Sequence, residues 1–408
     1  MSNVSTLNVF LYGELIGTIT HVGNDRSLFA FTEDYINDDA RSVLSLGFKD
    51  ALGGLITDFK PTQTALLPFF SNLLPEAHMR HYLAERAGVN PAREFFLLWV
   101  LGQDLPGAIT VMPADGEALP PGVNDAVDED RQKEGPMRFS LAGVQLKFSA
   151  VQHASGGLTI PATGTGGSWI VKLPSSRFEA VPENEFAMME LARLIGMNVP
   201  ETQLLSIDEI QNIPERIGQF GHSAFGIKRF DRLDDGQAVH MEDFAQIFSV
   251  YPHDKYKKAS MRNIAEVIGL EGQEEDVAEF VRRLVFNTLI GNADMHLKNW
   301  SMIYSDRVNA ALAPAYDFVS TIAYLADEGA ALKVSRSKKF SDFTLDELSH
   351  MAAKAMLPER LVIDTAKETV ATFHKVWKAE KSNLPLSKKI IEAIENHLQT
   401  VPLTGADV

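Results

Sequence analysis

The chain begins with apolar residues that alternate with polar ones. In residues 7–20, apolar and polar residues alternate on both sides of a Tyr-Gly-Glu sequence at positions 12–14, and this pattern predicts a β-hairpin. Farther along the chain, the spacing of apolar residues changes to three and four positions in segments near 66–84 and 91–101. This spacing predicts helices. We therefore expect residues 1–115 to form a small subdomain that contains both strands and helices.

A stretch rich in proline, glycine and aspartate interrupts these patterns, and we expect residues 116–136 to be a linker. Strand-like patterns then recur through residues 137–240. The expected strands cover 137–152, 158–173, 202–207 and 224–230, with one helix at 184–195 that Gly196 and Pro200 would end. This block is expected to be a strand-rich lobe.

Helical spacing dominates residues 241–408. The clearest helix is expected at 276–290, where one apolar stripe runs along the segment, and Gly291 can end it because glycine readily adopts the left-handed conformation. Two short strand-like segments, 300–304 and 307–312, predict a hairpin that returns the chain toward Gly291. The order of elements predicts a mixed α/β protein of the α+β type, with a strand-rich lobe followed by a helical lobe.

Composition narrows the class of protein. A chain of 408 residues with 45% hydrophobic and 23% charged residues is typical of a globular protein with two or three domains. It contains no cysteine, which excludes disulfides and thiolate metal sites, and its longest apolar runs, such as 95–101, are too short to cross a membrane. No basic segment precedes the first apolar run, so we expect a cytoplasmic protein without membrane contact.

The charge pattern argues against broad binding to nucleic acid. The formal net charge is −16, whereas contacts with phosphate backbones depend on clustered lysine and arginine. Basic exceptions at 255–258 and 333–339 are interpreted as solvated loops, with contact to an acidic partner or DNA as the alternative.

The polar segment after Gly291 carries the candidate chemistry. Asp294 and Asn299 lie in it, and Asp317 follows directly after Tyr316, beyond the expected hairpin. A phosphotransferase needs one carboxylate to accept the proton of the acceptor hydroxyl, while an amide and a second carboxylate hold Mg²⁺ on the phosphates of ATP. The Asp-to-Asn spacing alone also occurs in ordinary turns. Together with the later aspartate it predicts an ATP-dependent kinase.

An upstream lysine strengthens this prediction. Lys172 lies in an apolar strand, where an ammonium is costly unless an anion meets it, such as nucleotide phosphates or the carboxylate of Glu185. The alternative is a lysine on an edge strand that reaches water. Before this strand, Gly143 lies in a loop that can direct N–H groups at phosphate, with Lys147 adding charge, although one glycine is a weak signal. The glycine-rich stretch 163–167 is interpreted as a flexible connection.

A series of ordered motifs resembles the HipA-type toxin kinases of bacterial toxin–antitoxin modules. These motifs are 140–147, 170–174, 184–185, 229–232, 242–246, 294–299 and 316–317, with 69–75 and 107–110 upstream. The resemblance implies a bilobal kinase-like fold of the phosphatidylinositol-kinase-like group. It would contain a strand-rich N-lobe, an all-helical C-lobe and an extra N-terminal subdomain.

The resemblance also implies roles for individual residues. Asp294 corresponds to the catalytic base, Asn299 and Asp317 to the magnesium ligands, and Ser140 to the site at which relatives autophosphorylate and lose activity. The implied ATP-binding residues are Ala142, Gly143, Val144, Gln145, Leu146, Lys147, Lys172, Lys228, Arg229, Phe230, His296, Leu297, Lys298, Asn299, Tyr316 and Asp317. Lys228 stands where a relative has an acidic residue, so only its backbone is expected to meet adenine. Residues 333–346 match poorly, and no partner contact is transferred to them.

The implied activity is transfer of the γ-phosphoryl group of ATP to a protein serine or threonine, with Mg²⁺ as cofactor. The implied substrate is a translation-related protein, for which an aminoacyl-tRNA synthetase is a candidate. The implied partner is a HipB-like helix-turn-helix antitoxin, through which DNA would mainly be contacted. Two alternatives stay open: a kinase for small-molecule hydroxyl groups, and a non-catalytic co-repressor subunit of the antitoxin.

Overall fold

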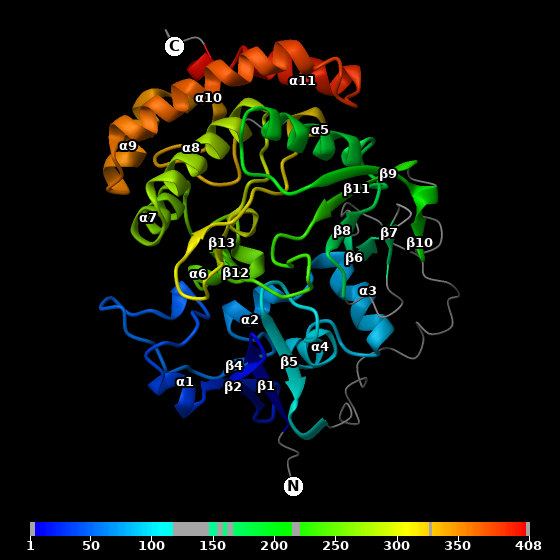
Figure 1. Ribbon diagram of the computed structural model, residues 1–408, viewed down its shortest axis with the longest axis vertical. Coiled ribbons are helices and arrows are strands. Elements are labelled where there is room, and N and C mark those ends of the chain that lie inside the picture. The colour runs from blue at the N-terminus through cyan, green and yellow to red at the C-terminus, as the bar shows by residue number, and fades with distance from the viewer. Residues whose placement is uncertain are drawn as a thin grey trace. The chain divides into compact units, whose positions relative to one another are not determined.

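The computed structural model describes residues 5–116, 147–152, 158–160, 166–213, 221–325 and 329–404 (Figure 1). The described residues form two compact units, and neither is continuous in sequence. Unit 1 contains the described part of 1–146 with 231–253 and 304–308, and unit 2 contains the described parts of 147–230, 254–303 and 309–408. Within these residues, no helix has both the length and the apolar character that a bilayer crossing requires.

An antiparallel sheet of five strands organises unit 1. Its order is β4 (Thr62–Gln63), β3 (Arg26–Phe31), β2 (Glu14–His21), β1 (Ser5–Leu11) and β5 (Ile109–Pro113). The predicted hairpin is confirmed as β1 and β2. Tyr12 and Gly13 join the two strands with φ of 53° and 81°, which is the backbone that a tight hairpin turn requires. Alternate residues of β1 are buried, as the sequence pattern predicts.

Short helices accompany this sheet. They are α1 (Glu33–Asn37), α2 (Pro68–Leu73), α3 (Ala77–Ala87), α4 (Glu94–Leu101) and α6 (Phe244–Ile247), the last of which follows strand β12 (His240–Asp243). The helical pattern at 66–84 is divided into α2 and α3, because Pro75 forces Leu74 into an extended conformation. The carboxylate of Glu94 ties these helices together, since it accepts hydrogen bonds from Leu66 N at 2.8 Å and from Ser71 Oγ at 2.9 Å.

A six-stranded sheet forms the strand-rich part of unit 2. Its order is β10 (Ile210–Gln211), β7 (Leu158–Thr159), β6 (Lys147–Gln152), β8 (Trp169–Lys172), β11 (Ser223–Lys228) and β9 (Thr202–Ser206). Helix α5 (Val181–Leu194) packs on β9 and β11 (Figure 1). The strands predicted at 202–207 and 224–230 agree with β9 and β11, whereas β7 and β8 are two separate strands within the single segment predicted at 158–173.

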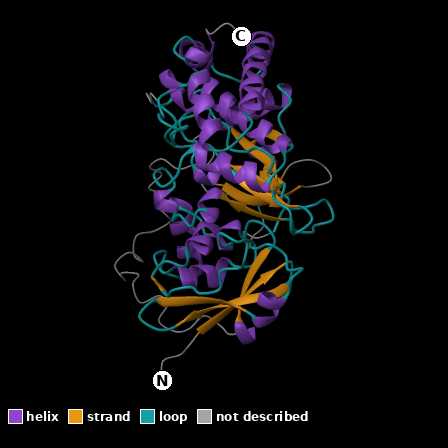
Figure 2. Cartoon of the chain, turned by 90° about the vertical axis from the view of Figure 1, so that its left-hand side faces the viewer, coloured by secondary structure: helices purple, strands orange, loops and turns teal. Residues whose placement is uncertain are grey.

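Helices form the rest of unit 2 and gather near the C-terminal end of the chain (Figure 2). They are α7 (Met261–Glu271), α8 (Glu274–Leu289), α9 (Leu345–Lys354), α10 (Glu359–Glu380) and α11 (Lys388–Leu398). Helix α8 packs against α7, α10 and α11, and its predicted apolar stripe is buried. The predicted hairpin is also present, because β13 (Ser301–Tyr304) pairs with β14 (Ala311–Leu312) through Met302 and Leu312, so this part is not purely helical.

Candidate functional site

The candidate site begins with two lysines on neighbouring strands of unit 2. Lys147 on β6 lies directly opposite Lys172 on β8, so their side chains leave the same face of the sheet. Lys172 forms ion pairs with Glu185 of α5 and with Asp317. Its side chain is only 12% exposed, so these carboxylates supply the anionic partners that the sequence requires for a lysine in an apolar strand.

Burial and charge set the protonation of this cluster. Burial lowers the pKa of Lys172, but the charges of Asp317 and Glu185 outweigh burial and hold its pKa above the ordinary value. Burial raises the pKa of Glu185 to about 7, against the attraction of Lys172. Burial also acts to raise the pKa of Asp317, but the charges of Lys172, Lys147 and, less strongly, His296 lower it to about 2. Asp317 is therefore ionised at neutral pH, and Glu185 is the carboxylate that takes up a proton first as pH falls.

The segment that carries Asp294 starts where α8 ends. Gly291 has φ of 65°, and a Cβ atom there would lie 2.5 Å from Cδ1 of Ile322. Thr321 Oγ1 donates to Gly291 O at 3.2 Å and accepts from Ala293 N at 2.8 Å. The glycine is thus required both by its backbone conformation and by the close packing of the following turn.

Asn292 connects the two acidic residues of the site. Its Oδ1 accepts a hydrogen bond from Asp294 N at 3.0 Å, and its Nδ2 donates to Asp317 O at 3.3 Å. The same Nδ2 donates to Asn287 Oδ1 of α8 at 2.8 Å. The sequence pattern predicts no role for Asn292, although its position directly after the helix-ending Gly291 is a signal that the sequence contains. It holds the backbones of Asp294 and Asp317 to the end of one helix.

Asn299 fixes the other side of the Asp294 segment. Its Nδ2 donates to Asp294 O at 2.9 Å, and Asn299 ends a short 3-10 helix that begins at Leu297. Leu297 and Asn299 are buried, whereas the side chain of Asp294 is exposed. The backbone of Asp294 is therefore held from both sides while its carboxylate faces solvent, where an acceptor hydroxyl group can reach it.

Aromatic side chains bring the predicted adenine residues to the same region of unit 2. The rings of Phe230 and Tyr316 lie with centroids 5.8 Å apart. The hydroxyl of Tyr316 donates to Lys298 O at 3.0 Å and lies 2.5 Å from Ser301 Oγ. Phe230 follows the end of β11, where Lys228 N donates to Glu201 O at 2.9 Å. Phe230, Tyr316 and Lys298 of the 296–299 segment thus lie close together.

Several predicted residues cannot be placed. Ser140 and residues 142–146, which include the predicted phosphate loop, lie outside the described residues. Lys147, the last residue of that motif, is described and lies on β6 opposite Lys172. The phosphate loop and the autophosphorylation site therefore stay predictions.

The described side chains fit a magnesium site of the kinase type. Mg²⁺ is usually held by one or two protein oxygens while phosphates and water supply the others. Asp317 offers an ionised carboxylate, and the amide oxygen of Asn299 is available because its nitrogen bonds to Asp294 O. Across the described residues, no three or more His, Asp or Glu side chains are grouped as a dedicated metal site, so phosphate and water would have to complete the coordination.

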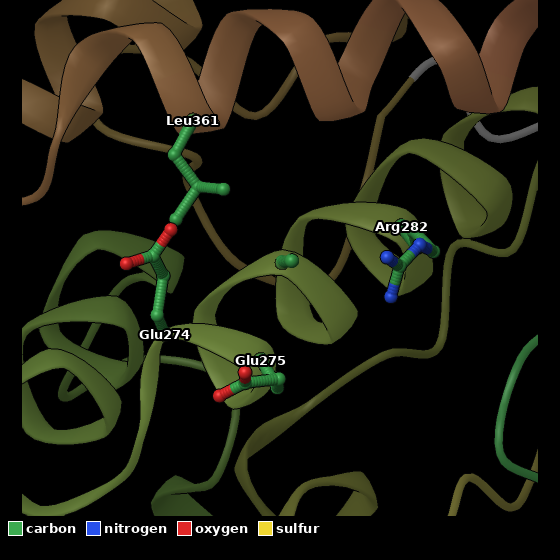
Figure 3. Close-up of a pocket in the computed structure, with 5 residues that line it drawn as sticks. Glu274, Glu275, Arg282 and Leu361 are labelled. Carbon is green, nitrogen blue, oxygen red and sulfur yellow. The ribbon is translucent and has the colours of Figure 1, made fainter.

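A surface hollow lies elsewhere in unit 2. It measures about 210 Å³, and none of the predicted site residues lines it; the lining consists of Glu274, Glu275, Ala278, Arg282 and Leu361 (Figure 3). The two glutamates belong to the first turn of α8 and would repel phosphate, and Arg282 already pairs with Glu279 at 3.2 Å. This hollow is therefore not a nucleotide site.

Sequence comparisons cover both parts of the chain. The HipA N-terminal domain matches residues 7–112, and the HipA-like C-terminal domain matches residues 139–377. The putative kinase Y4dM of Sinorhizobium fredii is 56% identical over 406 residues, which cover 99% of this chain and 98% of that protein. The serine/threonine-protein kinase toxin HipA of Shewanella oneidensis is 27% identical over 363 residues, 79% of this chain and 77% of its own.

A solved structure extends the comparison to the fold. A chain of the solved complex of Shewanella oneidensis HipA, HipB and operator DNA superposes with a TM-score of 0.72 at 22% identity, covering 98% of this chain and 100% of that one. The predicted mixed α/β, kinase-like fold is therefore confirmed. Because the two domain matches span most of the sequence and a 56% identical relative spans nearly all of it, the chain belongs to the HipA family.

Proposed function

We propose that this protein is a toxin kinase that transfers the γ-phosphoryl group of ATP to a serine or threonine of a protein. The observation that carries the proposal is the link through Asn292, which bonds to the backbones of both Asp294 and Asp317. A base and a metal ligand held from one helix end have the fixed mutual position that phosphoryl transfer requires. The names of the kinase relatives support the same reaction.

The site residues that the structure describes have distinct roles in the proposed reaction. Asp294 accepts the proton of the acceptor hydroxyl, whose oxygen bonds to the γ-phosphorus as the bond to the β–γ bridging oxygen breaks and ADP leaves. Asp317 and the amide oxygen of Asn299 would hold Mg²⁺, and the ion would supply positive charge that neutralises the phosphates. Lys172 binds phosphate oxygens while Glu185 keeps its ammonium in position.

The remaining predicted residues complete the nucleotide site. Phe230 and Tyr316 flank adenine, and backbone groups of Lys228 and Arg229 bond to its edge. His296, Leu297 and Lys298 orient the phosphates through the same turn that carries Asn299. Residues 142–147 are the expected phosphate-binding segment, and phosphorylation of Ser140 would switch activity off by adding negative charge beside that segment.

The partners follow from the same family. The matched Shewanella structure contains HipB and operator DNA, so we propose a HipB-like helix-turn-helix antitoxin that carries most of the DNA contact. The substrate is proposed to be a cytoplasmic protein of translation, with an aminoacyl-tRNA synthetase as the first candidate.

The catalytic assignment is tested with the purified chain, radiolabelled ATP and Mg²⁺. Asp294→Asn and Asp317→Asn should each abolish transfer to protein while thermal unfolding stays cooperative, because both replacements keep size and remove charge. Asparagine suits position 317 because the backbone there has φ of 58°, which asparagine tolerates. Asp364→Asn, at an exposed carboxylate on α10, is the matched control and should be fully active. Activity that survives in either site variant rejects the assigned role.

The toxin assignment needs a cellular measurement. Induced expression should arrest growth with the wild-type chain and not with Asp294→Asn, because arrest is proposed to depend on phosphoryl transfer. Arrest by both proteins would instead favour a role that does not use catalysis.

A further inference from the structure

A tyrosine contacts the exposed carboxylate of Asp294. The hydroxyl of Tyr256 donates a hydrogen bond of 2.6 Å to Asp294 Oδ1, across 38 positions of sequence. Both residues belong to unit 2. The basic residues at 255–258 predict only a solvated loop, so the contact of Tyr256 with Asp294 is a feature that the charge pattern does not predict.

The Tyr256 ring is itself held by the catalytic segment. It packs edge-to-face against the buried ring of His296, with centroids 5.0 Å apart and planes at 81°. In the neighbouring backbone, Leu297 N donates to Lys255 O at 3.4 Å. The phenol is thus positioned by the same turn that fixes the backbone of Asp294.

The backbone bonds alone do not fix the orientation of the Asp294 carboxylate. Asn292 and Asn299 contact the main chain of Asp294, and rotation about its side-chain bonds can still turn the two oxygens. The hydroxyl of Tyr256 engages Oδ1 and so restricts this rotation. A carboxylate that accepts a proton works best when its orientation toward the donor hydroxyl group is fixed before the reaction.

We propose that Tyr256 is a positioning residue for phosphoryl transfer, which holds the Asp294 carboxylate through Oδ1 in the orientation that accepts the proton of the acceptor hydroxyl. This inference rests on the proposed kinase function. Tyr256 acts through Asp294 and does not bind the nucleotide, so its removal should slow transfer and leave ATP binding unchanged.

The test compares replacements of Tyr256 that keep the aromatic ring and differ in whether the ring carries a hydrogen-bond donor. Tyr256→Phe keeps the ring that packs on His296 and removes the hydroxyl, whereas 4-aminophenylalanine at position 256 keeps the ring and restores an N–H donor. Tyr251→Phe is the control for loss of a phenol. For each protein, one measures the initial rate of ³²P transfer from ATP to myelin basic protein and to the chain itself, the ATP dissociation constant, and the melting temperature.

We expect Tyr256→Phe to lower the transfer rate at saturating ATP about tenfold, which corresponds to the loss of one partly solvated hydrogen bond. In Tyr256→Phe, the ATP dissociation constant should stay within about twofold of the wild-type value, and the melting temperature should stay within about 2 °C of it. The variant with 4-aminophenylalanine at position 256 should recover most of the transfer rate. A Phe variant as fast as or faster than wild type, or an aminophenylalanine variant as slow as Phe, overturns the inference. Asp294→Asn is included to test the proposed function itself, which is rejected if the wild type is inactive or if Asp294→Asn is active. If Asp294→Asn is inactive and Tyr256→Phe is as active as wild type, only the inference about Tyr256 is rejected.

Discussion

At the scale of single residues, burial of ionisable groups sets how this protein responds to pH. His240 lies in unit 1 with no exposed surface, and its Nε2 atom lies 2.8 Å from Leu44 O. Burial lowers the pKa of His240 to about 4, against smaller opposing effects from Leu44 and Asp231. The neutral ring is therefore the form that the folded state accepts.

This burial predicts a loss of stability in acid. An unfolded histidine takes up a proton near pH 6.5, while the folded one resists until about pH 4, so the unfolded state binds more protons between these values. The free energy of unfolding contributed by neutral His240 is present above pH 6.5 and falls as the pH drops toward 4. We expect the stability advantage of wild type over His240→Gln to shrink by about 2–3 kcal/mol between pH 7 and 4.5 in urea titrations.

Other buried ionisable groups do not change the difference in stability between wild type and His240→Gln. Burial also raises the pKa of Glu242 to about 7, which changes stability with pH in the opposite direction, but Glu242 is present in both proteins and its contribution cancels in the difference. Replacement of the exposed His222 by glutamine is measured in parallel, as a control for the loss of a histidine from the surface. An advantage of wild type over His240→Gln that is the same at both pH values contradicts the assignment.

At the scale of elements, the end of α8 determines the geometry of the site. The helix, its closing glycine and the following turn hold Asn292, and Asn292 bonds to both acidic residues. Sequence periodicity predicts α8 to within two residues because the pattern is local. The same periodicity could not reveal Tyr256, because its contact with Asp294 depends on a tertiary arrangement that no local pattern encodes.

The close packing at Gly291 leads to a test at this scale. In Gly291→Ala, the new methyl group meets Ile322 and the backbone has positive φ, so we expect unfolding free energy to fall by about 2–4 kcal/mol and transfer activity to drop sharply. Gly196 follows α5 with φ of 93° and open space around it, so Gly196→Ala should cost only about 1 kcal/mol and preserve activity. Equal costs in urea unfolding would show that contact with Ile322 does not matter. The double variant Gly291→Ala/Ile322→Ala removes the side chain that the new methyl group would meet, so it should recover part of the unfolding free energy lost in Gly291→Ala.

At the scale of the whole molecule, unit 1 is assembled from distant parts of the chain. The buried carboxylate of Glu242 accepts hydrogen bonds from Ser45 Oγ at 2.5 Å, Leu46 N at 2.8 Å and Tyr304 Oη at 2.5 Å. Asn72 Nδ2 likewise donates to Val250 O at 2.7 Å. The sequence predicts the local strands and helices of this unit well, but the addition of 231–253 and 304–308 depends on these long-range bonds.

This assembly predicts the behaviour of a fragment. The boundaries at 115, 136 and 240 stay predictions, and a chain that ends at residue 115 would lack the partners of Ser45 and Asn72. Such a fragment should exchange its backbone amides much faster than the same residues in the full chain and should unfold without a sharp transition, as measured by hydrogen exchange and circular dichroism. A fragment that unfolds cooperatively with native-like protection would indicate that residues 1–115 fold independently.

The double pairing of Lys172 has a consequence for the order in which ligands arrive. The ammonium of Lys172 pairs with the carboxylate of Asp317, which is proposed to hold magnesium. A bare divalent ion must compete with that ammonium for the same oxygen atoms, whereas a nucleotide offers the lysine phosphate in exchange. The protein should thus have low affinity for free magnesium and take up the ion together with ATP.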